Sequence, residues 1–412
     1  MAIIVQKFGG TSVANIERIK HVASLVKEEI NRGNQVVVVV SAMSGKTNEL
    51  VEWTNAVSDL TSHDSLKEYD SIVASGEQVT AGLLALTLQT NGLKARSWLG
   101  WQLGFKTDTT HSKARIEHID RDAIISSLND GYVAVIAGFQ GITEENRIAT
   151  LGRGGSDTSA VALAAALGAY QCDIYTDVDG IYTTDPRVVP KARRLNKIAY
   201  EEMLEMASLG AKVLQIRSVE MAMKHNVRVR VLSSFEPGEG TLLVDEEEVV
   251  ERRLVTGVTY NRNEDQITLT GVPNTPGVAA NIFAPLTEKE INVDMIVQNV
   301  SQSGDYTDIT FTIPKADTKL AIEQLEAVKN NLGYNSLMVN ENVAKVSVIG
   351  VGMRSHAGLA QKMFQTLADK SINILVITTS EIKISILIDE EYVELALRAL
   401  HSAYGLDATK ES

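Results

Sequence analysis

Short β-branched runs alternate with longer segments of helical spacing along the first half of this 412-residue sequence, and few folds accommodate that pattern. The run AIIVQ (2–6) is followed by an amphipathic segment at 16–30 and then by five valines at 36–40. A strand that is apolar on both faces must be covered on both faces. The pattern therefore predicts βαβ units, in which helices cover a parallel sheet on both sides.

The same pattern recurs at 132–139, 172–178 and 227–233. We therefore expect a three-layer α/β/α domain with a mainly parallel sheet over residues 1–245, followed by a linker and leading strand at 246–262.

A repeat follows this domain. The stretch at 267–283 matches 346–364: each has a strand, a glycine-containing turn and a helix that ends in Phe. Two copies are too few for a solenoid. We expect two small ferredoxin-like α+β modules at 263–341 and 342–412, each with the order strand, helix, strand, strand, strand or turn, helix.

Charge, cysteine content and hydrophobic patterning exclude several classes of protein. The formal net charge is -13 and the isoelectric point is about 5.1, which argues against nucleic acid as a partner, because such partners need a basic face. Cys172 is the single cysteine, so no intrachain disulfide is expected. The apolar run at 160–170 is too short to span a bilayer, and the N-terminus lacks a signal-peptide pattern. We expect a cytoplasmic protein without a membrane partner.

A first glycine turn lies at KFGGTSV, where a strand ends with Lys7 and runs through Gly9 and Gly10 toward a helix beginning near Ser12 or Asn15. Backbone amides and a lysine at such a position can converge on phosphate oxygens. An ordinary strand-to-helix turn is the alternative interpretation.

A second glycine turn, TLGRGGSDTSA (150–160), surrounds Arg153 with three glycines. A guanidinium can hold a carboxylate or a phosphate, and we expect Ser156, Asp157 and Thr158 to cap the helix that follows.

A third stretch, 172–190, leaves a strand and enters a polar loop. In open α/β sheets a nucleotide binds at that position. The segment Gly45-Lys46-Thr47 matches the end of the P-loop pattern GxxxxGK[ST]. The first glycine of that pattern would fall on Val40, which lies inside a predicted strand, so we reject a P-loop here.

Seven motifs in this order resemble the aspartate kinase family of amino-acid kinases. They are residues 7–13, 41–50, 75–79, 137–141, 150–160, 175–190 and 210–214. The doubled C-terminal unit resembles the paired ACT domains of feedback-regulated members. One departure is Gln215-Ile216, where many relatives carry His-Pro.

The resemblance implies transfer of the γ-phosphoryl group of ATP to the side-chain carboxylate of L-aspartate, the first step toward lysine, threonine and methionine. A carboxylate is already a nucleophile, so the obstacle is to bring two anions together. Mg²⁺ would be carried by ATP, and no protein-bound metal is expected.

The resemblance also implies the site residues, by their positions within the matching motifs. The catalytic residues would be Lys7, Arg153 and Asp177, with Lys7 as the main cation of the transition state. Arg153 would hold a carboxylate of aspartate and Glu77 its α-ammonium. The aspartate site would be completed by Ser41, Thr47, Gly154, Gly155 and Ser156. The ATP site would comprise Lys7, Phe8, Gly9, Gly10, Thr176, Asp177, Tyr182, Arg187, Lys212 and Val213.

The ACT resemblance implies an allosteric enzyme inhibited by lysine, threonine or both. In the first copy the candidate effector contacts are Asn274, Thr275, Gly277, Val278, Ala279, Asn292, Asp294, Gln298 and Ser301. In the second copy they are Asn373, Ile374 and Glu381. A homo-oligomer formed through the ACT domains is expected, with or without a shorter C-terminal subunit from an internal start. One copy serving only as a dimer interface is the alternative.

Two other functions fit parts of the pattern. An amino-acid kinase acting on glutamate, acetylglutamate, carbamate or UMP shares the fold, and a non-catalytic amino-acid sensor would need only the C-terminal modules. The motif SGEQ with Glu77 favours aspartate over the first, and intact Lys7, Arg153 and Asp177 argue against the second.

Overall fold

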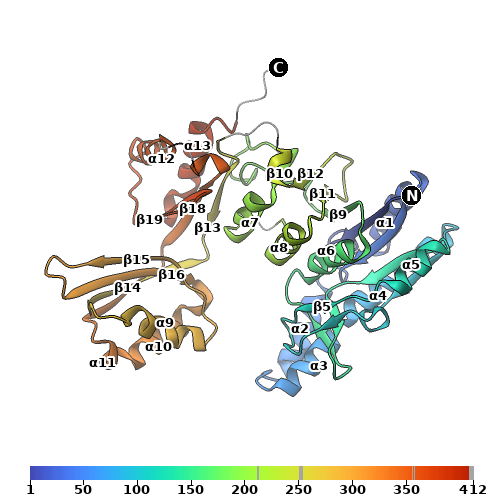
Figure 1. The fold of residues 1–412 in the computed structure, drawn as a ribbon, viewed down its shortest axis with the longest axis horizontal. Helices are drawn as coiled ribbons and strands as arrows, with labels where there is room; N and C mark the ends of the chain where they lie inside the picture. Colours follow the sequence, from blue (N-terminus) through green and yellow to red (C-terminus); the bar gives the residue numbers. More distant parts are fainter. Residues whose placement is uncertain (211–212, 250–253, 355, 357, 408–412) are drawn as a thin grey trace. The chain divides into compact units, whose positions relative to one another are not determined.

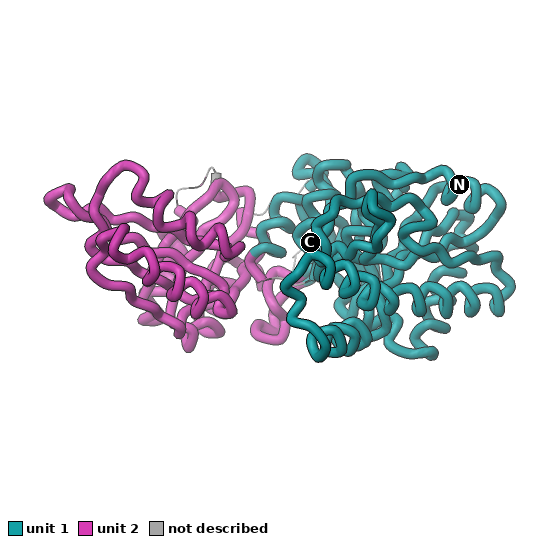
Figure 2. Tube along the Cα trace, turned by 90° about the horizontal axis from the view of Figure 1, so that it is seen from below, with its two compact units in different colours: residues 1–181, 194–208, 212–251 teal, residues 182–193, 209–211, 252–412 magenta. Residues whose placement is uncertain are grey.

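The computed structural model describes residues 1–210, 213–249, 254–354, 356 and 358–407. The chain forms two compact units (Figure 2). The first comprises Met1–Ile181, Arg194–Ser208 and Lys212–Glu251, and the second comprises Tyr182–Arg193, Leu209–Ala211 and Arg252–Ser412. Two short excursions of the N-terminal chain thus belong to the second unit.

An eight-stranded sheet forms the centre of the first unit, and its neighbouring strands are parallel except for β11 and β12. In spatial order the strands are β10 (Lys197–Ala199), β12 (Thr241–Val244), β11 (Val229–Ser233), β9 (Gln171–Thr176), β1 (Ile3–Phe8), β2 (Gln35–Val40), β6 (Val133–Ala137) and β3 (Ala95–Trp98). The β-branched runs therefore occupy the middle of the sheet, which confirms the predicted mainly parallel fold.

Helices cover both faces of this sheet. On one face α1 (Ile16–Asn31) and α4 (Ser75–Thr90) pack on Val36, Val38 and Val40. On the other face lies α6 (Gly155–Leu167), which contacts β1, β2 and β9 and lies beside α8 (Figure 1). The first ten residues of α6 are all buried, and from residue 160 onward the helix is apolar on every side, as expected for a helix enclosed within the domain. The other helices are α2 (Lys46–Val57), α3 (His63–Val73), α5 (Asp122–Asn129), α7 (Tyr200–Ser208) and α8 (Ile216–His225).

The helical stretch His63–Thr90 is long and apolar enough to cross a membrane by composition. It consists of α3 and α4, which meet at Ala74. Leu84 and Leu88 of α4 are fully buried against α1 and the sheet, which accounts for the apolar composition as that of a core helix.

A small second sheet connects the main sheet to the second glycine turn. Its order is β5 (Ile116–His118), β4 (Lys106–Thr107), β7 (Gln140–Ile142) and β8 (Ile148–Thr150). The chain passes from β6 into β7 through Gly138 and Phe139, and β8 then leads directly into the turn before α6.

The second unit contains the two predicted modules. The first has the sheet order β15 (Asp294–Val300), β16 (Tyr306–Pro314), β14 (Glu264–Pro273) and β17 (Ser336–Asn340), with helices α9 (Val278–Glu288), α10 (Thr318–Ala327) and α11 (Lys329–Leu332). The second has the order β13 (Gly257–Asn261), β18 (Val343–Ile349), β20 (Lys383–Asp389) and β19 (Val376–Thr379), with helices α12 (Gly358–Ala368) and α13 (Val393–Ala403).

The fourth strand of each module lies outside the repeated order. We expected a strand or a turn between the third strand and the second helix, and the structure has the short 3-10 turns Lys315–Asp317 and Glu390–Tyr392 there. The fourth strands are β17, which follows the helices of the first module, and β13, which lies in the segment predicted to hold a leading strand and precedes the first module. Because β13 pairs with β18, the first module is inserted between the first and second strands of the second module. Local periodicity does not reveal such long-range pairing.

The excursion Tyr182–Arg193 packs on the second module. Val189 belongs to the core of that module, and the Thr183 hydroxyl lies 2.8 Å from Nε2 of the buried His401. The backbone N–H of Val258 donates to the Thr183 carbonyl at 2.8 Å. This segment is therefore a structural part of the second unit.

Candidate active site

The motif residues of the first unit follow neighbouring strands. Phe8 at the end of β1 lies opposite Val40 of β2 and Tyr175 of β9, and Val40 lies opposite Ala137 of β6. Because these strands are parallel, the turns that follow them lie along one edge of the sheet, where open α/β sheets bind ligands.

Lys7 is nearly buried, with 8% of its surface exposed. Its Nζ lies 2.5 Å from Oδ1 of Asp157 in the first turn of α6. Alternation along β1 turns Lys7 away from the α1 face, to which Phe8 belongs, and toward α6. Removing one partner of such a buried pair leaves an uncompensated charge, which costs about 3–5 kcal/mol.

The second glycine turn adopts a backbone that side chains disfavour. Gly152 has φ 79° and Gly154 has φ 74°, both in the left-handed region. Arg153 between them is exposed. The turn therefore presents a guanidinium directly before the N-terminus of α6.

The residues predicted to cap α6 do not cap it. The N-cap is Gly154, which makes no side-chain cap hydrogen bond, whereas Ser156, Asp157 and Thr158 lie inside the first turn and are buried. Asp157 is used by Lys7 instead. A Cβ at Gly138 would lie 2.9 Å from Oγ of Ser156, so that glycine allows Ser156 to approach the end of β6.

Glu77 in the first turn of α4 is 3% exposed. Its Oε1 accepts a hydrogen bond from the N–H of Ala42 at 3.0 Å, while its buried Oε2 has no hydrogen-bond partner among the described residues. Burial raises the pKa of Glu77 to about 7, although the Ala42 N–H and the nearby charge of Lys7 act in the opposite direction. A buried carboxylate oxygen without a partner suits a cationic ligand.

Ser41 and Thr47 lie after β2. The N–H of Ser41 donates to the carbonyl of Phe8 at 3.1 Å, and Thr47 is half-buried in the first turn of α2. Lys46 is exposed and pairs with Glu49 at 2.5 Å, in keeping with the rejection of a P-loop.

The first glycine turn leads to a helix at the predicted place. The helix begins at Ile16 with Asn15 as its N-cap, which agrees with the predicted start near Ser12 or Asn15, and Gly9 and Gly10 lie before the first turn of that helix. The N–H of Gly9 donates to the carbonyl of Tyr175 at 3.2 Å, because the pairing of β1 with β9 continues past Phe8. This amide is therefore engaged within the protein.

The predicted nucleotide residues outside the first glycine turn fall into three groups. Thr176 and Asp177 follow β9, where the Thr176 hydroxyl donates to the Asp177 carboxylate at 3.1 Å. Val213 is half-buried before α8, and Lys212 lies outside the described residues. Tyr182 and Arg187 belong to the second unit, where the Arg187 guanidinium donates two hydrogen bonds to the Asp185 carboxylate, at 2.8 and 3.0 Å.

The predicted effector residues of the first module lie at both ends of its sheet, because Ser301 follows the end of β15 that pairs with Thr307, whereas Asp294 is at the end that pairs with Thr312. Asn274 donates from its side chain to the Gly304 carbonyl at 2.9 Å, so the turn before α9 lies against the turn that follows Ser301. Thr275, Ala279, Asn292 and Gln298 are exposed, Gly277 is the N-cap of α9 with φ 91°, and Val278 faces the core.

Asp294 and the residues of the second module have different surroundings. The carboxylate of Asp294 accepts a hydrogen bond from Nζ of Lys345, at 2.7 Å. In the second module Asn373 and Ile374 precede β19 and Glu381 follows it.

Sequence reasoning did not identify Asp157 as a partner of Lys7. An acidic residue in the first turn of a helix is normally explained by the helix dipole. The available signal was the apolar run that begins three residues after Asp157 on the same helix, because a charge at the start of a buried helix needs a partner.

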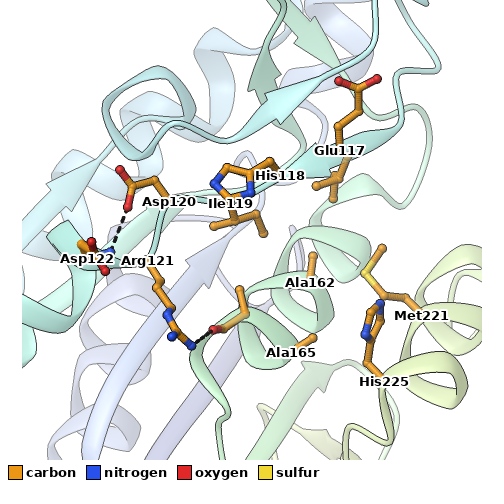
Figure 3. Close-up of a pocket in the computed structure, with 12 residues that line it drawn as sticks. Glu117, His118, Ile119, Asp120, Arg121, Asp122, Ala162, Ala165, Met221 and His225 are labelled. Atoms are coloured by element: carbon orange, nitrogen blue, oxygen red, sulfur yellow. Dashed lines mark hydrogen bonds between the residues drawn. The ribbon is translucent and has the colours of Figure 1, made fainter.

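A cavity of about 530 Å³ lies elsewhere in the first unit (Figure 3). Ala162 and Ala165 line it opposite His118 and Arg121. Ala165 lies ten residues after Gly155 along α6, or about 15 Å at the helical rise. The cavity is lined by none of the predicted site residues and is distinct from the edge that carries Lys7 and Glu77.

Comparison with known proteins identifies the family of each part of the chain. The sequence profile of the amino acid kinase family matches residues 2–233, and the ACT domain profile matches residues 267–328 and 346–404. The three-layer fold, the turns at its edge and the doubled C-terminal module thus define an amino acid kinase with paired ACT domains.

Individual relatives identify the group within the amino acid kinase family. The aspartokinase of Pseudomonas aeruginosa is 55% identical over 410 residues, which cover 99% of this chain and 98% of that protein. The crystal structure of E. coli aspartokinase III in complex with aspartate and ADP has 28% identity and a TM-score of 0.81, covering 97% of this chain and 99% of that one. The same enzyme in complex with lysine and aspartate has a TM-score of 0.78 at 28% identity, with the same coverage. The chain therefore belongs to the aspartate kinases of the amino acid kinase family, as the seven motifs predicted.

Proposed function

We propose that the protein transfers the γ-phosphoryl group of ATP to the side-chain carboxylate of L-aspartate and forms 4-phospho-L-aspartate and ADP. A carboxylate oxygen of aspartate forms a bond to the γ-phosphorus, and the bond from that phosphorus to the β,γ-bridging oxygen breaks. The observation that carries this proposal is the buried Oε2 of Glu77, which lacks a partner and can accept the α-ammonium of an amino acid.

Aspartate would be held by groups that match its charges. Glu77 takes the ammonium, exposed Arg153 takes a carboxylate, and Ser41, Thr47, Gly154, Gly155 and Ser156 complete the pocket. Two of these groups are fixed by their surroundings, since Glu77 accepts from Ala42 and Ser156 is buried at the start of α6. Fixed groups lose little freedom when substrate binds, which favours catalysis.

Lys7 would stabilise the charge that develops during transfer. Its pairing with Asp157 fixes Nζ at the sheet edge, and preorganised cations are effective because they need no reorganisation during the reaction. Mg²⁺ carried by ATP would neutralise further phosphate charge. We assign Phe8, Gly9, Gly10, Thr176, Asp177, Tyr182, Arg187, Lys212 and Val213 to the nucleotide side.

We further propose that lysine, threonine or both inhibit the enzyme through the ACT domains. Lysine occurs with aspartate in one crystal structure of the E. coli relative, which supports lysine as a ligand of this class. An effector acts only if its affinity differs between active and inactive arrangements. The proposal includes a homo-oligomer formed through the ACT domains, a cytoplasmic location and a place at the start of lysine, threonine and methionine biosynthesis.

A hydroxamate assay tests the reaction, because hydroxylamine traps an acyl phosphate. The purified full chain with ATP, Mg²⁺ and L-aspartate should form aspartyl hydroxamate, and glutamate, acetylglutamate, carbamate or UMP in place of aspartate should support little phosphoryl transfer, measured as ADP. Product from none of the substrates would favour a sensor and contradict the proposal, as would preference for another substrate. Rates measured with millimolar lysine, threonine and both together test inhibition separately.

A further inference from the structure

The turn that carries Arg153 is supported by a separate segment of chain, residues 111–114. The N–H of Ala114 donates to the carbonyl of Thr150 at 2.9 Å. A Cβ at Gly152 would lie 3.2 Å from the carbonyl oxygen of Ser112. The two segments are therefore in contact immediately before Arg153.

Asp70 of α3 links both segments with one carboxylate. Asp70 is fully buried, and its oxygens accept from the N–H of Ser112 at 3.0 Å and from the hydroxyl of Thr150 at 2.5 Å. Nδ1 of the buried His111 lies 2.7 Å from the same carboxylate. A buried carboxylate with several hydrogen bonds has little freedom to move, and neither do its partners.

Arg217 at the start of α8 links the same two segments through their carbonyls. Its guanidinium donates to Leu151 at 2.7 Å and to Ala114 at 2.9 Å. Residues 150–151 are thus joined to residues 112–114 by a carboxylate, a guanidinium and a backbone hydrogen bond.

We infer that Asp70 and Arg217 are positioning residues, which fix the direction in which Arg153 leaves the Gly152 turn. The turn needs such support, because glycine leaves the backbone freer than any other residue does, and the turn has glycines at positions 152 and 154. The inference rests on the proposed function, in which Arg153 holds a carboxylate of aspartate.

The principal test is Asp70→Asn in the full chain. The amide places an NH₂ group against the Ser112 N–H or the Thr150 hydroxyl and so weakens one link. We expect KM for aspartate to rise about 10- to 100-fold, the range found when supporting contacts of functional groups are removed. KM for ATP should stay within about twofold, since the links lead to Arg153 and not to the nucleotide residues.

Two further variants provide a test that does not depend on the folding of Asp70→Asn, and a control for the loss of a buried carboxylate. Thr150→Val removes one hydroxyl at nearly constant shape and should raise KM for aspartate about fivefold even if Asp70→Asn fails to fold. Asp173→Asn is the matched control, because Asp173 is also fully buried and pairs with Arg230 at 2.7 Å on the same unit. It should reduce thermal stability and leave both KM values unchanged.

The double variant Asp70→Asn/Arg153→Ala separates positioning from general loss of structure. If Asp70 acts through Arg153, KM for aspartate in the double variant should equal that of Arg153→Ala. An additive increase, or an unchanged KM in both Asp70→Asn and Thr150→Val, overturns the inference alone. An unchanged KM for aspartate in Arg153→Ala overturns the assignment of Arg153 in the proposed function, and the inference with it.

Discussion

Lys7 in the first unit and Lys345 in the second are the buried lysines of the described residues, and their surroundings differ. Lys345 of β18 pairs with Glu264 and Asp294 of the inserted module. Burial by itself would lower the pKa of Lys345, but these two carboxylates raise it. Lys7 has one carboxylate partner, Asp157.

The difference separates a charge whose partners are satisfied within the protein from one that lies beside an unsatisfied group. Around Lys345 the second carboxylate, Glu264, also accepts from Thr312 and Asn261, so the cluster is satisfied within the protein. Beside Lys7 stands Glu77, whose Oε2 has no hydrogen-bond partner within the described part of the chain. A buried polar group left incomplete is unfavourable for stability, and a bound ligand that completes it is one explanation for its presence.

Lys345→Met should give the largest effect, and that effect should be on stability. The variant leaves Glu264 buried without a cation, so we expect the free energy of unfolding to fall by about 3–5 kcal/mol. Chemical denaturation measures this, and kcat without effectors should be unchanged. A variant of wild-type stability would show that the cluster does not join the modules.

Lys7→Met should act on the reaction, in addition to the loss of stability expected when Asp157 is left buried without a cation. Loss of a preorganised cation lowers kcat by about 10²- to 10³-fold, or about 3–4 kcal/mol. Steady-state kinetics of ADP release measures it, with Lys345→Met as the control for removal of a buried lysine. Ordinary turnover in Lys7→Met would refute the role given to Lys7.

Glu77→Gln should raise stability while it weakens substrate binding. With its pKa raised from 4.5 to about 7, Glu77 holds its proton more tightly in the folded state, so stability falls as pH rises through that window. Removing the charge should add about 3 kcal/mol at pH 8 and nothing below pH 4.5.

The same variant should change the pH dependence of binding. In the wild type KM for aspartate should rise as pH falls below about 7, because a protonated Glu77 holds an ammonium weakly. In Glu77→Gln that rise should disappear and KM should be high at every pH. A wild-type KM that is constant between pH 6 and pH 8 would contradict the role of Glu77.

Lys46→Ala should have the smallest effect. Lys46 is exposed and pairs with Glu49 on the surface of α2, and such pairs contribute about 0–1 kcal/mol. KM for ATP should stay within about twofold. A large increase would mean that the Gly45-Lys46-Thr47 segment binds phosphate after all.

The sequence was sufficient to predict those features of the fold and the candidate site that depend on local residue patterns. The β-branched runs identified the parallel sheet, and the glycine turns identified the edge where Lys7 and Arg153 lie. The pairing of Lys7 with Asp157 and of β13 with β18 joins residues far apart in the chain, and periodicity contains no information on such contacts. Asp70 was missed for the same reason, since its partners lie more than 40 residues away.

The most direct test of the account compares the binding of L-aspartate with that of succinate, which has both carboxylates but no ammonium. Dissociation constants measured by calorimetry at pH 8 should favour aspartate by about 100-fold or more in the wild type, since a site built for a polar group rejects a ligand that lacks it. In Glu77→Gln that preference should fall to within a few fold. If Glu77→Gln kept the wild-type preference, the ammonium would be recognised elsewhere and the central claim would be wrong.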